Sequence, residues 1–278
     1  MRLSLPFANG LAGAVLAVGV MAASLFMAVP ASAGVTPVSI RSSAESGLAL
    51  RGQLYRPAGS RPAPAVILMH GCGGWQPSVL RGLDAYAKFL VGEGFVVLNL
   101  DSFGPRGNAG GTVCQSLNRL SAARRYRTND AYDAMHFLKS QSYVDSDSIF
   151  LIGQSNGGSV AMIAATQKGQ ARHARNETGF RGVVALYPWC GATGSRRPSL
   201  SAPLLILGGA LDDWVPAKDC QNFNAQGRNL RVKVFPNAAH SFDIPVPVHR
   251  YLGKLVGYNP SAAQSARSEI IRFFRAQM

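Results

Sequence analysis

A serine flanked by glycines is the residue of this chain best suited to act as a nucleophile. Ser155 stands at the centre of the motif G-Q-S-N-G at 153–157, between an apolar run at 148–152 and a segment of small residues at 158–167. Glycines at the outer positions let a buried strand turn sharply into a helix, and this turn exposes the central side chain. The motif alone also fits an ordinary turn rich in glycine and serine, but the flanking strand and helix favour a nucleophile elbow.

His240 is the histidine best placed to activate that serine. A serine hydroxyl is a poor nucleophile at neutral pH and needs an adjacent base, which a carboxylate holds in the correct tautomer. His240 follows residues 231–235, which alternate like a strand, so it can reach the elbow from the end of that strand. The other histidines lie in a predicted helix, in loops or in a glycine turn. The alternative interpretation of His240 is a surface or capping histidine.

Two adjacent aspartates are candidates for the carboxylate that orients this base. Asp212 and Asp213 directly follow an apolar run at 204–207. We favour Asp212, because Asp213 stands where it could cap a helix that starts near Pro216. Asp243 is a weaker candidate, because it lies on the far side of the predicted base in the sequence.

Chemistry at an acyl carbon also needs backbone N–H donors aimed at the oxygen on which negative charge develops, each worth about a hundredfold to a thousandfold in rate. The N–H of Asn156, directly after the candidate nucleophile, is one predicted donor. We assign the second to Cys72, in the glycine-rich turn at 70–74 that follows an apolar run at 65–69. A glycine-rich turn can also bind phosphate, but this one lacks the spacing of a dinucleotide-binding or P-loop motif.

Strands and helices alternate along the chain, which places these residues at strand ends. Apolar or alternating runs predict strands at 38–41, 48–55, 65–69, 95–100, 148–152, 182–187, 202–207 and 231–235. Helical spacing predicts helices at 84–92, 129–140, 158–167, 216–225 and 262–276. The first two strands predict an antiparallel hairpin. The whole pattern predicts an α/β fold with a mostly parallel sheet of about eight strands, helices on both faces and active residues at the carboxyl ends of strands.

Residues 1–33 have the features of an export signal. Arg2 provides a positive start, residues 11–29 are apolar, and A-S-A at 31–33 is a small-residue cleavage site. An uncleaved membrane anchor is the alternative, since the apolar run is nearly long enough to span a bilayer. We therefore expect a signal peptide at 1–33, a single catalytic domain at 34–278, and a periplasmic or secreted protein.

All four cysteines lie beyond that signal, and in an oxidising compartment an even number favours disulfide bonds. Three connectivities are possible, and we favour Cys72 with Cys114 and Cys190 with Cys220. Free buried thiols are the alternative. Each bridge would stabilise the fold by at most about 4 kcal/mol in the loop-entropy account. No C-x-x-C is present, so we expect no structural metal site.

Lysine and arginine outnumber the acids by 28 to 14, which gives a formal charge of +14. The basic residues are scattered, which predicts a solvated surface, and they include Arg119, Arg124, Arg125, Arg127, Lys168, Arg172, Arg175, Arg196, Arg197, Arg228 and Arg231. They do not form a nucleic-acid motif with interleaved aromatic residues, so we expect no nucleic-acid partner. The charge does predict weak adsorption to anionic envelope, lipid or polymer surfaces.

Five short motifs together resemble the dienelactone hydrolase branch of the α/β-hydrolases. They are H-G-C-G-G at 70–74, D-S-F-G-P-R-G at 101–107, G-Q-S-N-G-G at 153–158, D-D-W-V-P at 212–216 and A-H-S-F at 239–242. The resemblance covers nearly all of the chain after residue 33. It implies an α/β-hydrolase fold and hydrolysis of small esters or lactones, without a cofactor, through an acyl-enzyme on the elbow residue. The order Ser, Asp, His along the chain is also that of this fold.

Two features depart from the family pattern. The founding dienelactone hydrolases carry cysteine where this chain has Ser155, and they are cytoplasmic, so we expect a general carboxylesterase rather than an enzyme for dienelactone itself. A polyester hydrolase or a prolyl-oligopeptidase-like peptidase would use the same triad, although a peptidase usually carries a large extra domain. The alternative of another class is a non-catalytic envelope-binding module on a hydrolase scaffold.

Overall fold

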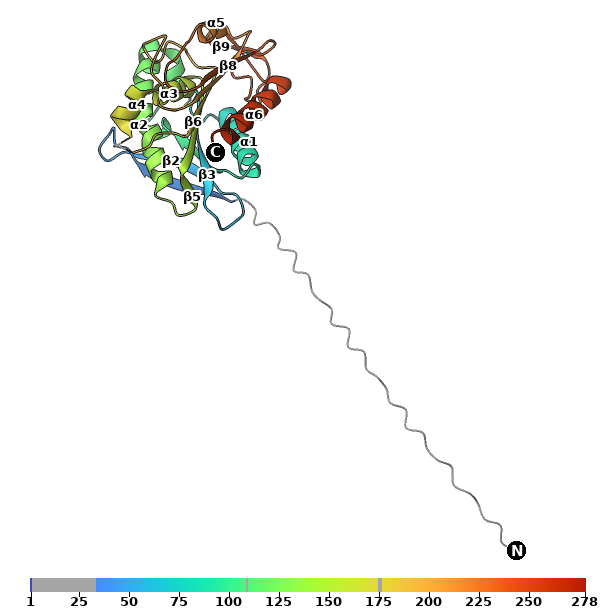
Figure 1. The fold of residues 1–278 in the computed structure, drawn as a ribbon. Helices are drawn as coiled ribbons and strands as arrows, with labels where there is room; N and C mark the ends of the chain where they lie inside the picture. The colour runs from blue at the N-terminus through green and yellow to red at the C-terminus, as the bar shows by residue number, and fades with distance from the viewer. Residues whose placement is uncertain (2–33, 109, 175–176) are drawn as a thin grey trace. The chain divides into compact units, whose positions relative to one another are not determined.

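The computed structural model describes Met1 and residues 34–108, 110–174 and 177–278. The chain divides into Met1–Pro30 and one compact unit over Ala31–Met278, which contains the helices and strands shown in Figure 1. Apart from Met1, the predicted signal peptide and its alternative, an uncleaved anchor, fall outside the described residues. Within those residues, no helix has both the length and the hydropathy that a membrane span needs.

Eight strands form one sheet in this unit. Their order across the sheet is β1 (Val35–Arg41), β2 (Ala49–Tyr55), β4 (Val96–Asp101), β3 (Ala63–Met69), β5 (Val144–Gln154), β6 (Gly182–Leu186), β7 (Leu204–Gly209) and β8 (Leu230–Phe235). The β1–β2 and β2–β4 pairs are antiparallel, and every pair from β4 to β8 is parallel. This arrangement confirms the predicted mostly parallel sheet with an antiparallel hairpin at its start.

Helices cover both faces of the sheet, as predicted (Figure 1). They are α1 (Pro77–Gly92), α2 (Leu117–Lys139), α3 (Asn156–Ala164), α4 (Gln167–His173), α5 (Ala217–Gln221) and α6 (Pro260–Arg275), with short 3-10 helices η1 (Gly104–Arg106) and η2 (Thr112–Gln115). Ile67 of β3 lies in one apolar core with Met135 of α2. Its neighbour Leu68 lies in the other core with Leu83 of α1 and Phe274 of α6. Successive strand side chains face opposite ways, so a strand covered on both faces is apolar throughout.

Two helices begin well before the residues at which the sequence pattern predicted them to start. α1 begins at Pro77. Proline suits the first turn of a helix, because an N–H at that position would have no acceptor within the helix. α2 begins at Leu117, and Ser116 caps its first turn. The first half of α2 is rich in arginine, so it lacks the apolar period by which a helix is recognised in a sequence.

Two further elements differ from the prediction. The helix after the elbow is two helices: α3 ends at Ala164, and Thr166 starts α4 by accepting a hydrogen bond of 3.0 Å from the N–H of Gly169. A small hairpin of β9 (His249–Tyr251) and β10 (Lys254–Val256) lies outside the main sheet and was not predicted. Strands of three residues are too short to show an alternating pattern.

Candidate active site

Ser155 lies at the turn between β5 and α3 in a backbone conformation that non-glycine residues rarely adopt, with φ of 52° and ψ of −114°. The flanking glycines are sterically required. A Cβ on Gly153 would collide with the carbonyl group of Gly157, and a Cβ on Gly157 would lie 2.5 Å from the carbonyl oxygen of Met69. The tight strand-to-helix turn therefore needs glycine at both positions, as a nucleophile elbow does.

His240 connects Ser155 to Asp212. Its Nε2 lies 2.9 Å from Ser155 Oγ, and its Nδ1 lies 2.7 Å from Asp212 Oδ2. Because the carboxylate can only accept, Nδ1 carries the proton and Nε2 is left to accept the proton of the serine. The second carboxylate oxygen accepts hydrogen bonds of 2.9 Å from the backbone N–H groups of Trp214 and Val215, which fix its orientation. The structure thus brings together the three residues that the sequence singled out.

Asp213 contacts the β9–β10 hairpin instead of the histidine. Its carboxylate accepts hydrogen bonds from the N–H of Leu255 at 2.7 Å and from the Arg250 guanidinium at 3.0 Å. These donors lower the pKa of Asp213 below its ordinary value. The predicted capping role of Asp213 is wrong, because α5 has Pro216 at its N-cap and no side-chain capping bond. The Asp213 carboxylate instead accepts a hydrogen bond from the backbone N–H of Leu255, on the hairpin that was not predicted.

Asp243, the third aspartate considered, is buried, and in the described residues its side chain is hydrogen-bonded to residues other than His240. It accepts hydrogen bonds from the Tyr187 hydroxyl at 2.6 Å and from the Gln154 side-chain amide at 2.8 Å. Burial raises the pKa of this carboxyl group. The ring of Tyr187 packs edge-on against His240 with centroids 4.7 Å apart, so Asp243 holds a ring that supports the base.

The turn after β3 lies against the elbow. A Cβ on Gly71 would be 3.2 Å from the Cβ of Ser155, so glycine allows this close approach. The next residue, Cys72, is disulfide-bonded to Cys114 of η2, with the Cα atoms 5.0 Å apart. Asn156 is the first residue of α3, so its N–H has no acceptor within the helix. Both residues predicted to supply oxyanion donors therefore belong to segments next to Ser155.

The second disulfide joins Cys190, after β6, to Cys220 of α5, with the Cα atoms 5.1 Å apart. Together the two bridges confirm the favoured pairing, and they leave no free cysteine in the described part of the chain. The first bridge borders the elbow, whereas the second ties α5 to the loop after β6. Both therefore connect segments that follow strand ends.

A cavity of about 190 Å³ opens beside the Ser155 side chain. Its lining is mostly apolar and includes Cys72, Val79, Tyr187, Trp214 and Ile244. This volume is below the roughly 300–1,000 Å³ of a typical site for a drug-sized molecule, so the cavity fits a small group. Across residues 34–108, 110–174 and 177–278, no group of three or more His, Cys, Asp or Glu side chains is placed to hold a metal ion.

The model of the dienelactone hydrolase family matches residues 50–278 of this chain. The chain belongs to that family. As a member it is a carboxylic ester hydrolase with the α/β-hydrolase fold, which confirms the reaction class and the fold that the five sequence motifs implied.

Individual relatives of this dienelactone hydrolase family member are distant. An uncharacterized protein of Mycobacterium tuberculosis (strain CDC 1551 / Oshkosh) is 29% identical over 228 residues, covering 77% of this chain and 76% of its own length. A Bradyrhizobium sp protein named "Probable 2-oxo-3-(5-oxofuran-2-ylidene)propanoate lactonase" is 25% identical over 255 residues. The match covers 86% of this chain and 92% of that protein. The dienelactone hydrolase structure from Anabaena variabilis ATCC 29413 matches with a TM-score of 0.62 and 18% identity. The match covers 88% of this chain and 98% of that structure's chain. That last likeness supports the fold alone.

Arg127 corrects the prediction that the basic residues are solvated surface, because its side chain is fully buried. Its guanidinium donates hydrogen bonds to Asn156 Oδ1 at 2.8 Å and to the carbonyl oxygen of His70 at 2.6 Å. It also lies 4.6 Å from the ring centroid of Phe103. Burial lowers the pKa of Arg127 to about 10, so the side chain remains charged at neutral pH. No signal in the sequence separates this arginine from the other arginines of α2, which are exposed or half-buried.

His70 is a second buried group beside the elbow. Its Nδ1 lies 2.7 Å from the carbonyl oxygen of Gly71, which can only accept, so Nδ1 carries the proton. Its Nε2 accepts a longer hydrogen bond of 3.4 Å from the N–H of Ser102. Burial lowers the pKa of His70 to about 3, and the nearby Arg127 guanidinium adds to this effect. The ring is therefore neutral at physiological pH and fixes the turn that contains Cys72.

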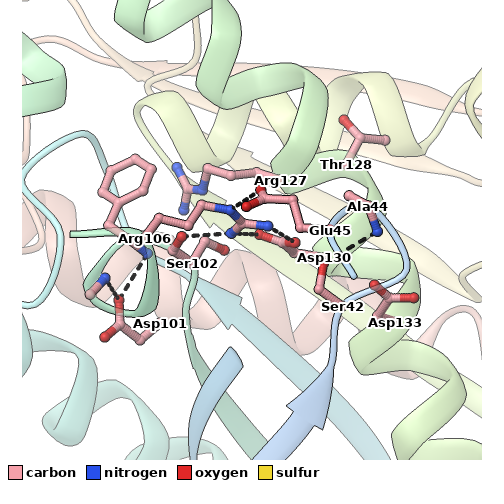
Figure 2. Close-up of polar contacts among 12 residues, drawn as sticks. Ser42, Ala44, Glu45, Asp101, Ser102, Arg106, Arg127, Thr128, Asp130 and Asp133 are labelled. Atoms are coloured by element: carbon pink, nitrogen blue, oxygen red, sulfur yellow. Dashed lines mark hydrogen bonds and ion pairs between the residues drawn. The ribbon is translucent and has the colours of Figure 1, made fainter. Parts of the chain in front are cut away.

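The motif at 101–107 anchors the loop after β4 through a buried ion pair (Figure 2). Arg106 forms two hydrogen bonds to the Asp130 carboxylate, of 2.8 and 2.9 Å. It also donates to Glu45 at 2.6 Å and to the carbonyl oxygen of Ser102 at 2.7 Å. Asp101 accepts from the N–H of Gly104 at 2.8 Å and so closes the turn. These residues position the loop but do not line the cavity.

The buried His70 makes the fold sensitive to acid. Its pKa is 6.5 when unperturbed and about 3 when folded, so between these values the unfolded state binds more protons and the free energy of unfolding falls as the pH falls. We expect the melting temperature to drop between about pH 7 and about pH 4.5, and to drop less in His70→Gln. Burial raises the pKa values of Asp243 and Asp130, so these two groups increase the free energy of unfolding as the pH falls. Both groups are present in the unchanged protein and in His70→Gln, so they do not account for a difference between the two. Equal drops in both proteins would contradict the assignment to His70.

Proposed function

We propose that this protein hydrolyses small carboxylic esters or lactones through an acyl-enzyme on Ser155. His240 is the general base and Asp212 orients its imidazole. The observation that carries the proposal is the unbroken chain of hydrogen bonds from the serine on the elbow, of 2.9 Å to His240 and of 2.7 Å onward to Asp212. That arrangement is the one by which a base activates a serine hydroxyl.

The reaction has two halves. In the first, Ser155 Oγ attacks the acyl carbon while its proton moves to His240 Nε2, and the carbonyl oxygen becomes an oxyanion held by the N–H groups of Asn156 and Cys72. The same Nε2 then gives the proton to the leaving alcohol. In the second, water loses a proton to His240 and attacks the acyl-enzyme, and the acid is released with Ser155 reprotonated. Asp212 stabilises the imidazolium in both halves.

The substrate is expected to be small. The cavity beside Ser155 is about 190 Å³ and largely apolar, which suits a short acyl group or a compact ring. Cyclic esters fit the same chemistry, and the Bradyrhizobium relative is named for a lactone. Ser155 replaces the cysteine of the founding enzymes, so we propose a general esterase rather than an enzyme for dienelactone itself. No cofactor takes part in the proposed steps.

We further propose that the enzyme is exported and acts outside the cytoplasm. The signal-like sequence at 1–33 supports this, and so do the two disulfides, which form and persist in oxidising compartments. The catalytic domain is then the single unit at 34–278. Weak adsorption to anionic surfaces, which the charge of +14 favours, remains a prediction.

A series of p-nitrophenyl esters from acetate to palmitate tests this function. We expect activity that falls as the acyl chain grows, because the cavity holds only a small group, and that disappears after treatment with a fluorophosphonate. Activity that rises with chain length would instead favour a polyester hydrolase acting at surfaces. Absence of both ester hydrolysis and fluorophosphonate labelling would contradict the proposal and favour the non-catalytic binding module, while labelling with hydrolysis of peptide amides alone would favour the peptidase.

A further inference from the structure

Arg127 is a fully buried cation that takes no part in the proposed reaction. Its two terminal nitrogens donate to two different segments, one to the side chain of Asn156 and one to the carbonyl oxygen of His70. Asn156 carries one proposed oxyanion donor, and His70 begins the turn that carries the other, Cys72. We propose that Arg127 is a positioning residue that holds both oxyanion donors in place beside Ser155. This inference rests on the proposed function.

Both segments are held from α2, the helix that carries Arg127. The Asn156 side chain accepts from Arg127 at 2.8 Å and donates to the carbonyl oxygen of Leu120 on α2 at 3.1 Å. With both ends of this side chain bonded, the first residue of α3 is fixed relative to α2. The bond to His70 at 2.6 Å fixes the start of the other segment in the same way. One helix therefore holds the two segments that carry the N–H groups.

The surroundings of Arg127 favour a functional reason for its charge. Burying a cation is costly unless a carboxylate pairs with it. No carboxylate is hydrogen-bonded to Arg127 in the described residues, because Asp130, one turn along α2, is paired with Arg106. The Nε of Arg127 also has no partner there. A hydrophobic side chain at this position would avoid that cost, but it would leave the side-chain oxygen of Asn156 and the carbonyl oxygen of His70 without the donor that holds them.

The positive charge of Arg127 is buried but not isolated from carboxylates. The guanidinium bonds to both segments, and the charges of Asp130 and Asp101 also act on it. Water cannot screen it, because the side chain has no exposed area. The two N–H donors that Arg127 holds act on charge that develops only in the transition state, which is the condition for raising kcat rather than lowering KM.

The test compares Arg127→Met and Arg127→Lys with the unchanged protein on p-nitrophenyl acetate. Rates are expressed per active site titrated with a fluorophosphonate, so that loss of folded protein does not count as loss of catalysis. We expect kcat per titrated site to fall about a hundredfold in Arg127→Met with KM changed by less than about threefold. Binding of a trifluoromethyl ketone, which forms a tetrahedral oxyanion adduct on the serine, should weaken by the same factor. Arg127→Lys, which keeps the charge but not the forked geometry, should lie between.

Arg124→Met is the matched control. Arg124 lies one turn earlier on α2 and is stacked 4.5 Å from the ring centroid of Trp189, so its loss removes a partly buried arginine from the same helix without touching either donor segment. Its kcat per titrated site should stay within about twofold, since in the described residues Arg124 is not hydrogen-bonded to His70 or Asn156. Equal kcat losses in the Arg124 and Arg127 variants would overturn the inference.

A second variant covers the case in which Arg127→Met does not fold. Asn156→Ala removes the acceptor of one Arg127 bond while keeping the backbone N–H. We expect Asn156→Ala to lower kcat about tenfold. Its effect should not add to that of Arg127→Lys, because both substitutions remove the same hydrogen bond between Arg127 and Asn156. Additive effects, or unchanged kcat per titrated site in either Arg127 variant, would overturn the inference. Failure of the proposed function is distinguishable, because the unchanged protein would then not be labelled at Ser155 at all.

Discussion

Ser155→Ala is expected to lower kcat for p-nitrophenyl acetate by about a millionfold, the loss seen when a triad serine is removed. The alanine has no oxygen to attack the acyl carbon, so no acyl-enzyme forms. The Cβ of the alanine keeps the position of the serine Cβ, and the glycines that permit the turn are unchanged, so the fold should be unaffected. The measurement is the steady-state rate, with covalent labelling by a fluorophosphonate as a second readout.

Ser159→Ala provides the control for this variant. Ser159 lies one turn further along α3 and is buried, but within the described residues its hydroxyl bonds only to the carbonyl oxygen of Ser155 and to the N–H of Trp189. Its loss should cost some stability and leave kcat within about threefold, since it does not reach His240. If Ser155→Ala retained esterase activity and labelling, the nucleophile would be elsewhere.

Asp212→Asn is expected to lower kcat by about ten-thousandfold while leaving the fold intact. The amide can donate a hydrogen bond to the imidazole, which favours the tautomer with its proton on Nε2 and so removes the acceptor for the serine proton. Asp212 Oδ2 lies 2.7 Å from His240 Nδ1, so an amide at this position can donate its hydrogen bond directly to that nitrogen. The loss should appear in kcat for ester hydrolysis across neutral pH.

The neighbouring Asp213→Asn is the matched comparison. The side chain of Asp213 is exposed and bonded to Leu255 and Arg250 of the hairpin region, not to the histidine. Its loss should change kcat by less than about twofold, because exposed ion pairs contribute little. A larger loss from Asp213→Asn than from Asp212→Asn would mean that the assignment of the triad acid is reversed.

The sequence predicted the sheet well and the helix starts poorly. Each of the eight strands overlaps a predicted run, because buried parallel strands are apolar along their length. The first half of α2 was missed, since its arginines hide the helical period, and the β9–β10 hairpin was missed because its strands are three residues long. That hairpin also explains why Asp213 was misjudged, since its true partner was not predicted to be there.

The order of strands and helices, the family, and the serine, histidine and aspartates of the candidate site can all be inferred from the amino-acid sequence. These features depend on neighbours in the chain, such as the glycines around Ser155. Which aspartate bonds to His240, and the burial of Arg127 between two segments, depend on how distant parts of the chain pack together. Arg127 and the His70 carbonyl that it binds are 57 residues apart, so burial and pairing of such a charge follow from contacts that no local pattern records.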